Sequence, residues 1–238
     1  PDTDCIYELP LIFQEEGLRE ILAKHLKIDL SKDLVEWKAI VEKIKNPSKT
    51  INVALCGKYT EIEDSYISIQ HALMHSGAHL DTRVNLKLIE TTDIEEGKPV
   101  TELLNGIDGV IIPGGFGARG VEGKIAVIKH CRENNIPLLG LCYGLQLAVT
   151  EFARNVCNLQ DANTTENDPN TKNPVIDILP EQKEIINKGG TMRLGEYKAI
   201  LKPGTKVHNL YNSDVAFERH RHRYEVNNLY VDEIEKSG

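Results

Sequence analysis

The sequence predicts an α/β fold: a doubly wound, mainly parallel β-sheet with helices on both faces and a small antiparallel addition. Three observations predict it. Between residues 51 and 142, four short β-rich runs alternate with segments of helical periodicity, which is typical of parallel strands connected by helices. Glycine-rich turns follow two of these runs. After about residue 160 the alternation weakens, and strand-like segments follow one another.

Residues 1–47 are predicted to begin with an extended apolar segment, which segments of helical periodicity follow. Leucine and isoleucine recur at helical spacing across residues 18–44. The polar stretch KNPSKT (45–50) contains a proline and interrupts this pattern, so we place a linker there and a main domain over residues 48–238. The chain begins without methionine and ends in a helical pattern, from which we expect a piece of a longer polypeptide.

The predicted strands of the main sheet are INVALCG (51–57), LKLIE (86–90), GVIIPGG (109–115) and IPLLGLC (136–142). In open parallel sheets, ligands bind beyond the carboxyl ends of the strands. PGGFG and GLCYG both lie at such strand ends, so we expect them at the ligand-binding edge of the sheet. The antiparallel addition is predicted from TMRLGEYKAIL (191–201) and VAFERHRHRYEV (215–226).

Composition narrows the function classes. The formal net charge is −8, from 36 acidic and 28 basic residues, which argues against a nucleic-acid-binding surface. No apolar run approaches the roughly 20 residues that span a bilayer, so no membrane contact is expected. The five cysteines form no C-x-x-C pair, so neither a disulfide framework nor a zinc site is predicted. A reducing, cytoplasmic setting is the simplest interpretation.

The strongest candidate for chemistry is Cys142, in GLCYGL (140–145). A G-x-C-x-G turn between a strand and a helix resembles the nucleophile elbow known with serine, where glycines relieve crowding at a strained residue. At the start of the following helix, the thiol is expected to gain thiolate character from unpaired N–H groups. The alternative is a structural cysteine, since free cysteines are often buried, and we assign Cys56, Cys131 and Cys157 to core or helix positions.

The glycine-rich stretch PGGFGARG (113–120) is a candidate anion site. Backbone N–H groups after a strand can point at a phosphate or at a tetrahedral oxyanion. The stretch matches neither the P-loop nor the dinucleotide-binding signature, so phosphate binding is a weak hypothesis. As half of an oxyanion hole, with the Tyr143 N–H as the other half, it suits the position of Cys142. The alternative is a tight turn made of glycines.

The stretch ERHRHRYE (218–225) is basic in an acidic chain. If it is a strand, its three arginines share one face and its two histidines the other: Arg219, Arg221 and Arg223 against His220 and His222. Such arginines suit a carboxylate or phosphate, and the alternative is a solvated edge strand. No third ligand accompanies the histidines, so no metal is predicted. Glu166, in the polar loop 161–174, is either solvated or, opposite an arginine, a partner for an ammonium group.

Together these stretches resemble the class I glutamine amidotransferases, and among them the glutaminase domains of the CTP synthase family. The resemblance rests on PGGFGARGVEGK, ENNIPLLGLCYGLQLAVTEFARNV, GGTMRLG and RHRHRYEVNN, and it covers nearly the whole chain. IYELPLIFQEEGL is similar to the end of the preceding synthetase domain, so residues 1–47 are expected to hold that end and the interdomain linker. The resemblance implies a flavodoxin-like sheet of the class I amidotransferase type.

The resemblance also implies a cytoplasmic enzyme of pyrimidine nucleotide synthesis. In this family, the glutaminase supplies ammonia to the synthetase domain of the same polypeptide, which uses ATP and Mg²⁺ to aminate UTP to CTP. GTP is the activator, and the whole enzyme is expected to be a homotetramer. The ATP, UTP and Mg²⁺ sites belong to the synthetase domain, so no cofactor is expected on residues 1–238 themselves.

The family assigns residue roles as well. Cys142 is the nucleophile that forms a thioester with L-glutamine, and the backbone N–H groups of Gly115 and Tyr143 hold the oxyanion. The expected substrate contacts are Gly115, Tyr143, Gly144, Leu145, Gln146, Glu166 and Arg223. Arg221 is the alternative to Arg223, because the repeated arginines make the register ambiguous. An aliphatic residue is more usual than tyrosine at position 143.

One departure from the family is serious. Its general base and orienting acid belong to a His-Pro-Glu motif near the C-terminus, and no His-Pro-Glu occurs in these 238 residues. We therefore expect an incomplete triad and weak or no activity from this chain alone, since a missing base costs about 10²–10⁴ in rate. His222 or His220 is a poor substitute, because the same strand must bind substrate.

Other functions stay open at this point. A hydrolase or peptidase could use the same cysteine elbow, and it would need neither Glu166 nor the arginine strand. A non-catalytic module could bind a nucleotide on the glycine loop and the arginines. A purely structural interaction domain leaves both of these features unexplained.

Overall fold

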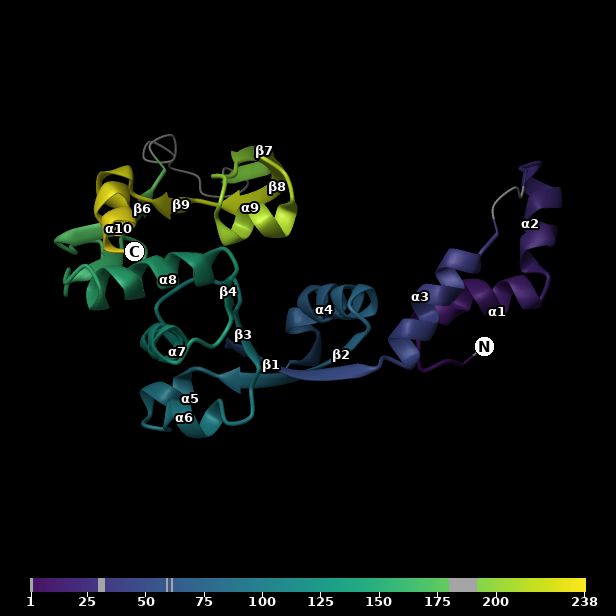
Figure 1. The fold of residues 1–238 in the computed structure, drawn as a ribbon, viewed down its shortest axis with the longest axis horizontal. Coiled ribbons are helices and arrows are strands. Elements are labelled where there is room, and N and C mark those ends of the chain that lie inside the picture. Colours follow the sequence, from purple (N-terminus) through teal and green to yellow (C-terminus); the bar gives the residue numbers. More distant parts are fainter. Residues whose placement is uncertain (1, 30–32, 59, 61, 180–191) are drawn as a thin grey trace. The chain divides into compact units, whose positions relative to one another are not determined.

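The computed structural model describes residues 2–29, 33–58, 60, 62–179 and 192–238 (Figure 1). The chain divides into two compact units. The first combines Pro1–Ala54, Tyr59–Leu88 and Gly106–Gly109, and the second combines Leu55–Lys58, Ile89–Asn105 and Val110–Gly238.

The N-terminal part of the first unit is helical: η1 (Ile6–Glu8), α1 (Leu9–Glu15), α2 (Leu18–Leu26) and α3 (Val35–Lys45). The extended opening that the sequence predicts is therefore wrong. Pro10 lies in the first turn of α1, where the missing N–H would have no helical partner in any case. The predicted break at KNPSKT is confirmed, since α3 ends at Lys45 and β1 begins at Lys49.

The first unit also contains η2 (Glu63–Tyr66) and α4 (Ile67–His79). The Tyr7 hydroxyl lies 2.9 Å from His71 Nδ1 and 2.6 Å from His75 Nε2, so the N-terminal segment contacts α4. The Trp37 indole donates to the Tyr7 carbonyl at 2.7 Å and holds α3 on the same segment.

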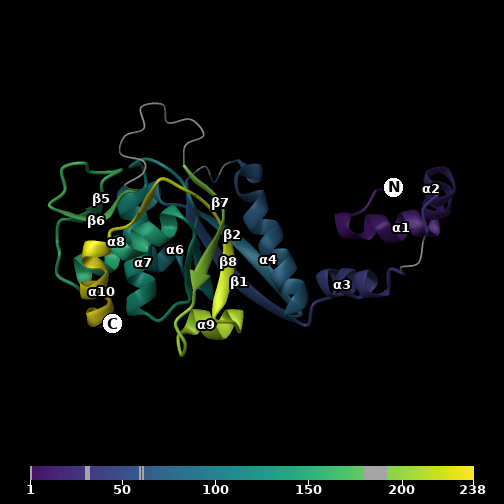
Figure 2. The same ribbon diagram turned by 90° about the horizontal axis from the view of Figure 1, so that it is seen from above.

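The central sheet has four strands in the order β2-β1-β3-β4. Its strands β1 and β2 are labelled in Figure 2. They are β1 (Lys49–Gly57), β2 (Thr82–Glu90), β3 (Gly109–Ile112) and β4 (Leu138–Gly140). Strands β3 and β4 are parallel, with Val110 opposite Leu138 and Ile112 opposite Gly140. Their carboxyl ends therefore lie at one edge, and the glycine-rich loop and Cys142 follow from that edge, as predicted.

The second unit carries most of the remaining helices, namely α5 (Thr92–Glu95), α6 (Val100–Leu103), α7 (Val121–Glu133), α8 (Tyr143–Asn155), α9 (Lys206–Tyr211), η4 (Asn228–Tyr230) and α10 (Val231–Ser237). Helices α7 and α8 pack against each other, and both bury an apolar face. A further cluster of Ala153, Ala162, Val175 and Ile176 is fully buried and joins α8 to strands β5 and β6.

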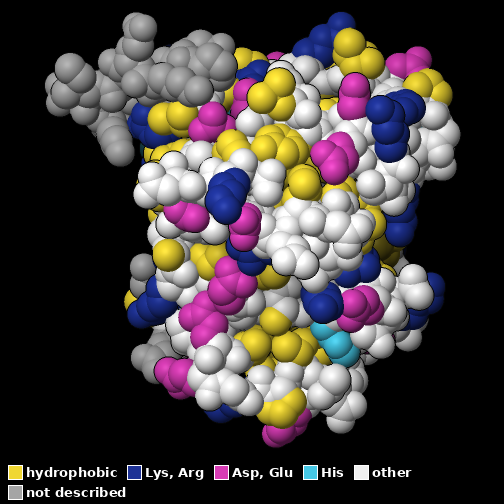
Figure 3. Space-filling model, turned by 90° about the vertical axis from the view of Figure 1, so that its left-hand side faces the viewer, with side chains coloured by type: hydrophobic (Ala, Val, Ile, Leu, Met, Phe, Trp, Pro, Cys, Tyr) yellow, Lys and Arg dark blue, Asp and Glu magenta, His cyan; other side chains and the backbone are white. Residues whose placement is uncertain are grey.

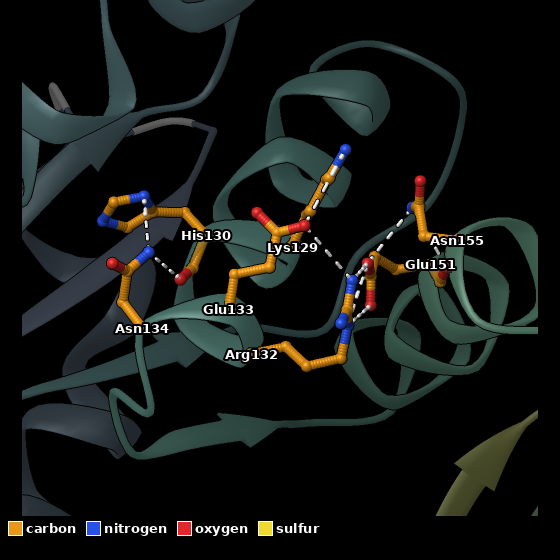
Figure 4. Close-up of polar contacts among 7 residues, drawn as sticks. All are labelled: Lys129, His130, Arg132, Glu133, Asn134, Glu151 and Asn155. Atoms are coloured by element: carbon orange, nitrogen blue, oxygen red, sulfur yellow. Dashed lines mark hydrogen bonds and ion pairs between the residues drawn. The ribbon is translucent and has the colours of Figure 1, made fainter. Parts of the chain in front are cut away.

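An ion pair clamps α8 to α7 (Figure 4). Glu151 on α8 is almost completely buried, and both of its oxygens accept from the Arg132 guanidinium at 2.8–3.2 Å. The Asn155 amide donates to the same carboxylate at 3.1 Å. A buried carboxylate needs such partners because its desolvation is otherwise uncompensated. The clamp therefore helps to hold the helix that begins next to Cys142.

The antiparallel addition consists of β7 (Arg193–Ile200) and β8 (Val215–His222), which pair along their whole length with Gly195 opposite His220. A second small sheet contains β5 (Ala162–Thr164), β6 (Asn173–Ile178) and β9 (Tyr224–Val226) in the order β5-β6-β9. The chain passes from β8 to β9 through a bend at Arg223. This bend matters for the site, because it interrupts the alternation of side chains along the basic stretch.

Acidic and basic side chains are interspersed on the face drawn in Figure 3, without a broad basic area among its described residues. No helix in the described part of the chain has the length and apolar character that crossing a membrane requires.

Candidate active site

Cys142 lies on a strained turn between β4 and α8. Its φ of 51° and ψ of −103° fall in a sparsely populated region that costs a non-glycine residue about 1–3 kcal/mol. The flanking glycines are required sterically. A Cβ on Gly140 would lie 2.6 Å from the Gly144 carbonyl carbon, and one on Gly144 would lie 2.1 Å from the Ile112 oxygen. The predicted strained turn between a strand and a helix is confirmed.

A cavity of about 440 Å³ lies beside the thiol. Three segments far apart in the sequence supply most of its wall: the loop after β3, the start of α8, and the stretch around the β8–β9 bend. Glu166 and Met192 complete it. Its lining includes Gly115, Phe116, Gly117, Cys142, Tyr143, Gln146, Glu166, Met192, His222, Arg223 and Tyr224. The first three residues of GGTMRLG, 189–191, lie outside the described residues.

The structure separates the two candidate arginines. Arg223 is buried at the bend and lines the cavity that contains Glu166. Arg221 is exposed on β8 and lines a neighbouring cavity of about 770 Å³ that also reaches Cys142. The prediction that Arg219, Arg221 and Arg223 share one face is wrong for Arg223, because β8 ends at His222. The repeated sequence could not reveal this interruption.

Two other predicted contacts lie elsewhere. Gly144 is buried against the Ile112 carbonyl and does not line the 440 Å³ cavity, so its place in the structure is steric. Leu145 points to the neighbouring cavity and is 54% exposed. Gln146 does line the cavity: its Nε2 donates to the Tyr224 carbonyl at 3.0 Å, and its buried Oε1 has no partner among the described residues. That oxygen is an acceptor available to a ligand.

The expected thiolate character of Cys142 is wrong for this state of the protein. Although the residue is exposed as a whole, partial desolvation of the sulfur raises the pKa of the thiol, the Tyr143 N–H lowers it by a smaller amount, and the charge of Glu166 raises it further. The thiol lies 3.8 Å from the Arg221 carbonyl and can donate to it. Cys142 is therefore protonated at neutral pH and needs a base before it can attack.

His222 lines the same cavity, but both of its ring nitrogens are engaged. Nδ1 lies 2.9 Å from the Tyr224 carbonyl, and Nε2 lies 2.9 Å from His220 Nδ1. The carbonyl requires a proton on Nδ1, so Nε2 accepts from His220. Burial lowers the pKa of His222, and the hydrogen bond to the Tyr224 carbonyl opposes this shift only in part. Its geometry is that of a structural link, in keeping with the prediction that it is a poor base.

Two lysines lie close to the glycine loop, and sequence reasoning missed both. Lys58 follows β1 and donates to the Phe116 carbonyl. Lys124 on α7 is fully buried, with its ammonium 5.5 Å from the centroid of the Tyr143 ring. Burial and the charge of Lys58 lower the pKa of Lys124 to about 8. Neither lysine belongs to a motif that signals such a position.

No group of three or more histidine, cysteine or acidic side chains among the described residues is arranged to hold a metal ion.

Comparison with known proteins identifies the family of this chain. The family described as "Glutamine amidotransferase class-I" matches residues 61–238. This chain belongs to that family. The class I amidotransferase fold, with its parallel central sheet, is therefore confirmed.

Relatives refine the comparison. CTP synthase from Methanocaldococcus jannaschii is 51% identical over 244 residues, and CTP synthase from Pyrococcus furiosus is 48% identical over 238 residues. Each alignment covers 100% of this chain but only 45% and 44% of the relative, so the chain spans less than half of their length. A solved structure of the Trypanosoma brucei CTPS glutaminase domain with bound acivicin superposes with a TM-score of 0.71 and 35% identity. That match covers 79% of this chain and 72% of the other.

Proposed function

We propose that this amidotransferase chain is the glutaminase part of a CTP-forming ligase and that its cavity binds L-glutamine. One observation supports this substrate: the cavity is lined both by Cys142 on its strained turn and by the opposite charges of Glu166 and Arg223. This pair suits the ammonium and carboxylate of an amino acid. The orphan Gln146 oxygen is a further acceptor for the ammonium.

The reaction has two halves. The Cys142 sulfur bonds to the side-chain amide carbon of glutamine, and the resulting oxyanion accepts from the N–H groups of Gly115 and Tyr143. Collapse breaks the C–N bond and releases ammonia, which carries away a proton that began on the thiol. Water then attacks the thioester, giving glutamate and the free thiol.

Removal of the proton from the Cys142 thiol is expected to be the slow step when residues 1–238 act alone. The Cys142 thiol is protonated, and His222 has no nitrogen to spare. We propose that a histidine in a His-Pro-Glu motif acts as the base, and that residues 1–238 alone turn over glutamine at least 10²-fold more slowly than a chain with it. In the whole protein, a synthetase part would use ATP and Mg²⁺ to aminate UTP, with GTP as activator. A cytoplasmic homotetramer is part of the same proposal.

The test is covalent labelling by a glutamine-like diazoketone, followed by peptide mapping, with and without excess L-glutamine. The expected result is labelling at Cys142 that L-glutamine suppresses and D-glutamine does not. The variant Cys142→Ser loses the label. The matched control Cys157→Ser, which alters a half-buried thiol just beyond α8, keeps it.

The same labelling is repeated on a chain extended through a His-Pro-Glu motif. Absence of glutamine-protected labelling in that chain would refute the glutaminase proposal. Labelling that glutamine does not suppress would favour the alternative hydrolase that uses only the cysteine elbow.

A further inference from the structure

The side chain of Tyr143 lies where three parts of the proposed glutamine site meet. The ring is almost completely buried, and the hydroxyl donates to Asn167 Oδ1 at 2.6 Å. The same hydroxyl lies 3.4 Å from the Gly117 carbonyl. Burial raises the pKa of Tyr143 to about 12, so the hydroxyl keeps its proton across the physiological range. These contacts are made by the side chain and are independent of the backbone N–H of Tyr143, which is the proposed oxyanion donor.

The glycine loop is held from both sides at the peptide that joins Phe116 to Gly117. The carbonyl of this peptide accepts from the Lys58 ammonium, and its N–H donates to Glu166 Oε1 at 3.1 Å. The next carbonyl, that of Gly117, is the one near the Tyr143 hydroxyl. Rotation of this peptide would therefore break contacts on both of its faces.

These contacts close a ring. The ring runs from Tyr143 to Asn167, along the chain to Glu166, across to Gly117, and back to the Tyr143 hydroxyl. It ties the loop that carries the proposed oxyanion donor Gly115 to the loop that carries the proposed ammonium partner. The start of α8, next to the nucleophile, anchors both loops.

We propose that the Tyr143 hydroxyl is a positioning group that fixes the glycine loop and the 165–168 loop in their substrate-binding arrangement before glutamine arrives. This inference rests on the proposed function for its effect on glutamine binding. The closed set of hydrogen bonds through Tyr143, Asn167, Glu166 and Gly117 is present without a ligand. Prior ordering of a site lowers the entropy lost on binding. Loss of the hydroxyl also removes the donor to Oδ1 of the partly buried Asn167 side chain. A buried polar group without a partner is unfavourable.

The variant Tyr143→Phe tests this role. It keeps the ring above Lys124 and keeps the backbone N–H, and it removes only the hydroxyl. We expect the diazoketone concentration at half-maximal labelling rate, and the glutamine concentration that halves labelling, to rise about tenfold, which is what the loss of one such hydrogen bond gives. The maximal labelling rate stays within about twofold, because the thiol and oxyanion donors are unchanged.

Amide hydrogen exchange provides the second readout and needs no ligand. In Tyr143→Phe, peptides covering residues 113–118 and 164–168 are expected to exchange about tenfold faster, and the α7 peptides to keep their wild-type rates. The matched control is Tyr230→Phe, which removes a phenol hydroxyl from a tyrosine packed on the opposite end of α8. The double variant Tyr143→Phe with Asn167→Leu is expected to add little to the single one, since both remove the same hydrogen bond.

Wild-type exchange in Tyr143→Phe, or an unchanged half-protecting glutamine concentration, would overturn the positioning role while leaving the glutaminase proposal intact. A fall in maximal labelling rate together with a lower melting temperature would also overturn it, in favour of a purely structural tyrosine. Failure of glutamine to protect the wild-type extended chain would instead refute the proposed function, and the exchange result would still decide whether the ring orders the two loops.

Discussion

Replacement of Lys124 by methionine should make the protein more stable, and the size of the gain should depend on pH. Lys124 is fully buried on α7 beneath the glycine loop. Burial and then the positive charge of Lys58 lower its pKa from 10.5 to about 8, and Glu90 and Glu95 oppose this shift only in part. Methionine has a similar length and carries no charge that must leave water.

The magnitude follows from the pKa shift. Each pKa unit corresponds to about 1.4 kcal/mol, so a fall from 10.5 to about 8 amounts to roughly 3 kcal/mol of destabilisation. Between these two values the unfolded chain binds more protons than the folded one, so the free energy of unfolding rises with pH. Below pH 8 the penalty is fully present, and above about pH 10.5 it has vanished. Loss of the contact with the Tyr143 ring offsets about 0.5–2 kcal/mol of the gain.

The assay is urea unfolding at pH 7, 8, 9 and 10, with Lys129→Met as control, because Lys129 lies on the same helix with its side chain half exposed. Relative to wild type, Lys124→Met should gain about 1–3 kcal/mol at pH 7 and progressively less toward pH 10. The control should stay within about 0.5 kcal/mol at every pH. A difference between Lys124→Met and wild type that is the same at pH 7 and pH 10 would refute the reasoning.

Three further predictions concern the clamp, the turn and the cavity. Glu151→Gln should lower the free energy of unfolding by about 1.5–3 kcal/mol, because the neutral amide accepts more weakly from the partly exposed Arg132 guanidinium than the buried carboxylate does. The half-exposed Glu133→Gln should change it by under about 0.5 kcal/mol in the same urea titration. Gly144→Ala should abolish labelling of Cys142 and lower the melting temperature, since its Cβ would overlap the Ile112 backbone oxygen. Labelling at the wild-type rate would contradict the turn geometry. Arg223→Gln should raise the half-protecting glutamine concentration by about 100-fold and Arg221→Gln by less than about threefold, and a reversed order would contradict the assignment of the buried arginine.

Short-range patterns predicted most of the main sheet and the turn that holds Cys142. The alternation of apolar runs and helical periodicity predicted the strands and helices of the main sheet, because each element buries one face through the spacing of its own residues. The G-x-C-x-G turn predicted the strained Cys142, since the crowding that demands Gly140 and Gly144 arises within a few residues of the turn. The break at KNPSKT followed from its proline and its polarity.

The apolar opening shows where a local pattern misleads. Leu9 to Glu15 form a helix although a proline lies in the run, because a proline in the first helical turn removes an N–H that would have no helical partner. The composition of the segment does not reveal whether its proline lies in the first turn or in the interior of a helix.

What the sequence determined by itself was therefore the class of fold and the strained turn at Cys142, both of which depend on contacts between near neighbours in the chain. Only the tertiary structure decided which arginine lines the cavity that contains Glu166, since β8 ends at His222 and the bend at Arg223 interrupts the strand alternation. It also decided the raised pKa of Cys142, which comes chiefly from desolvation of the thiol and then from the charge of Glu166. The ring of hydrogen bonds through Tyr143 likewise depends on the loop of Glu166 and Asn167, more than twenty residues from the turn along the chain. Burial and charge act through space, and a linear pattern records neither.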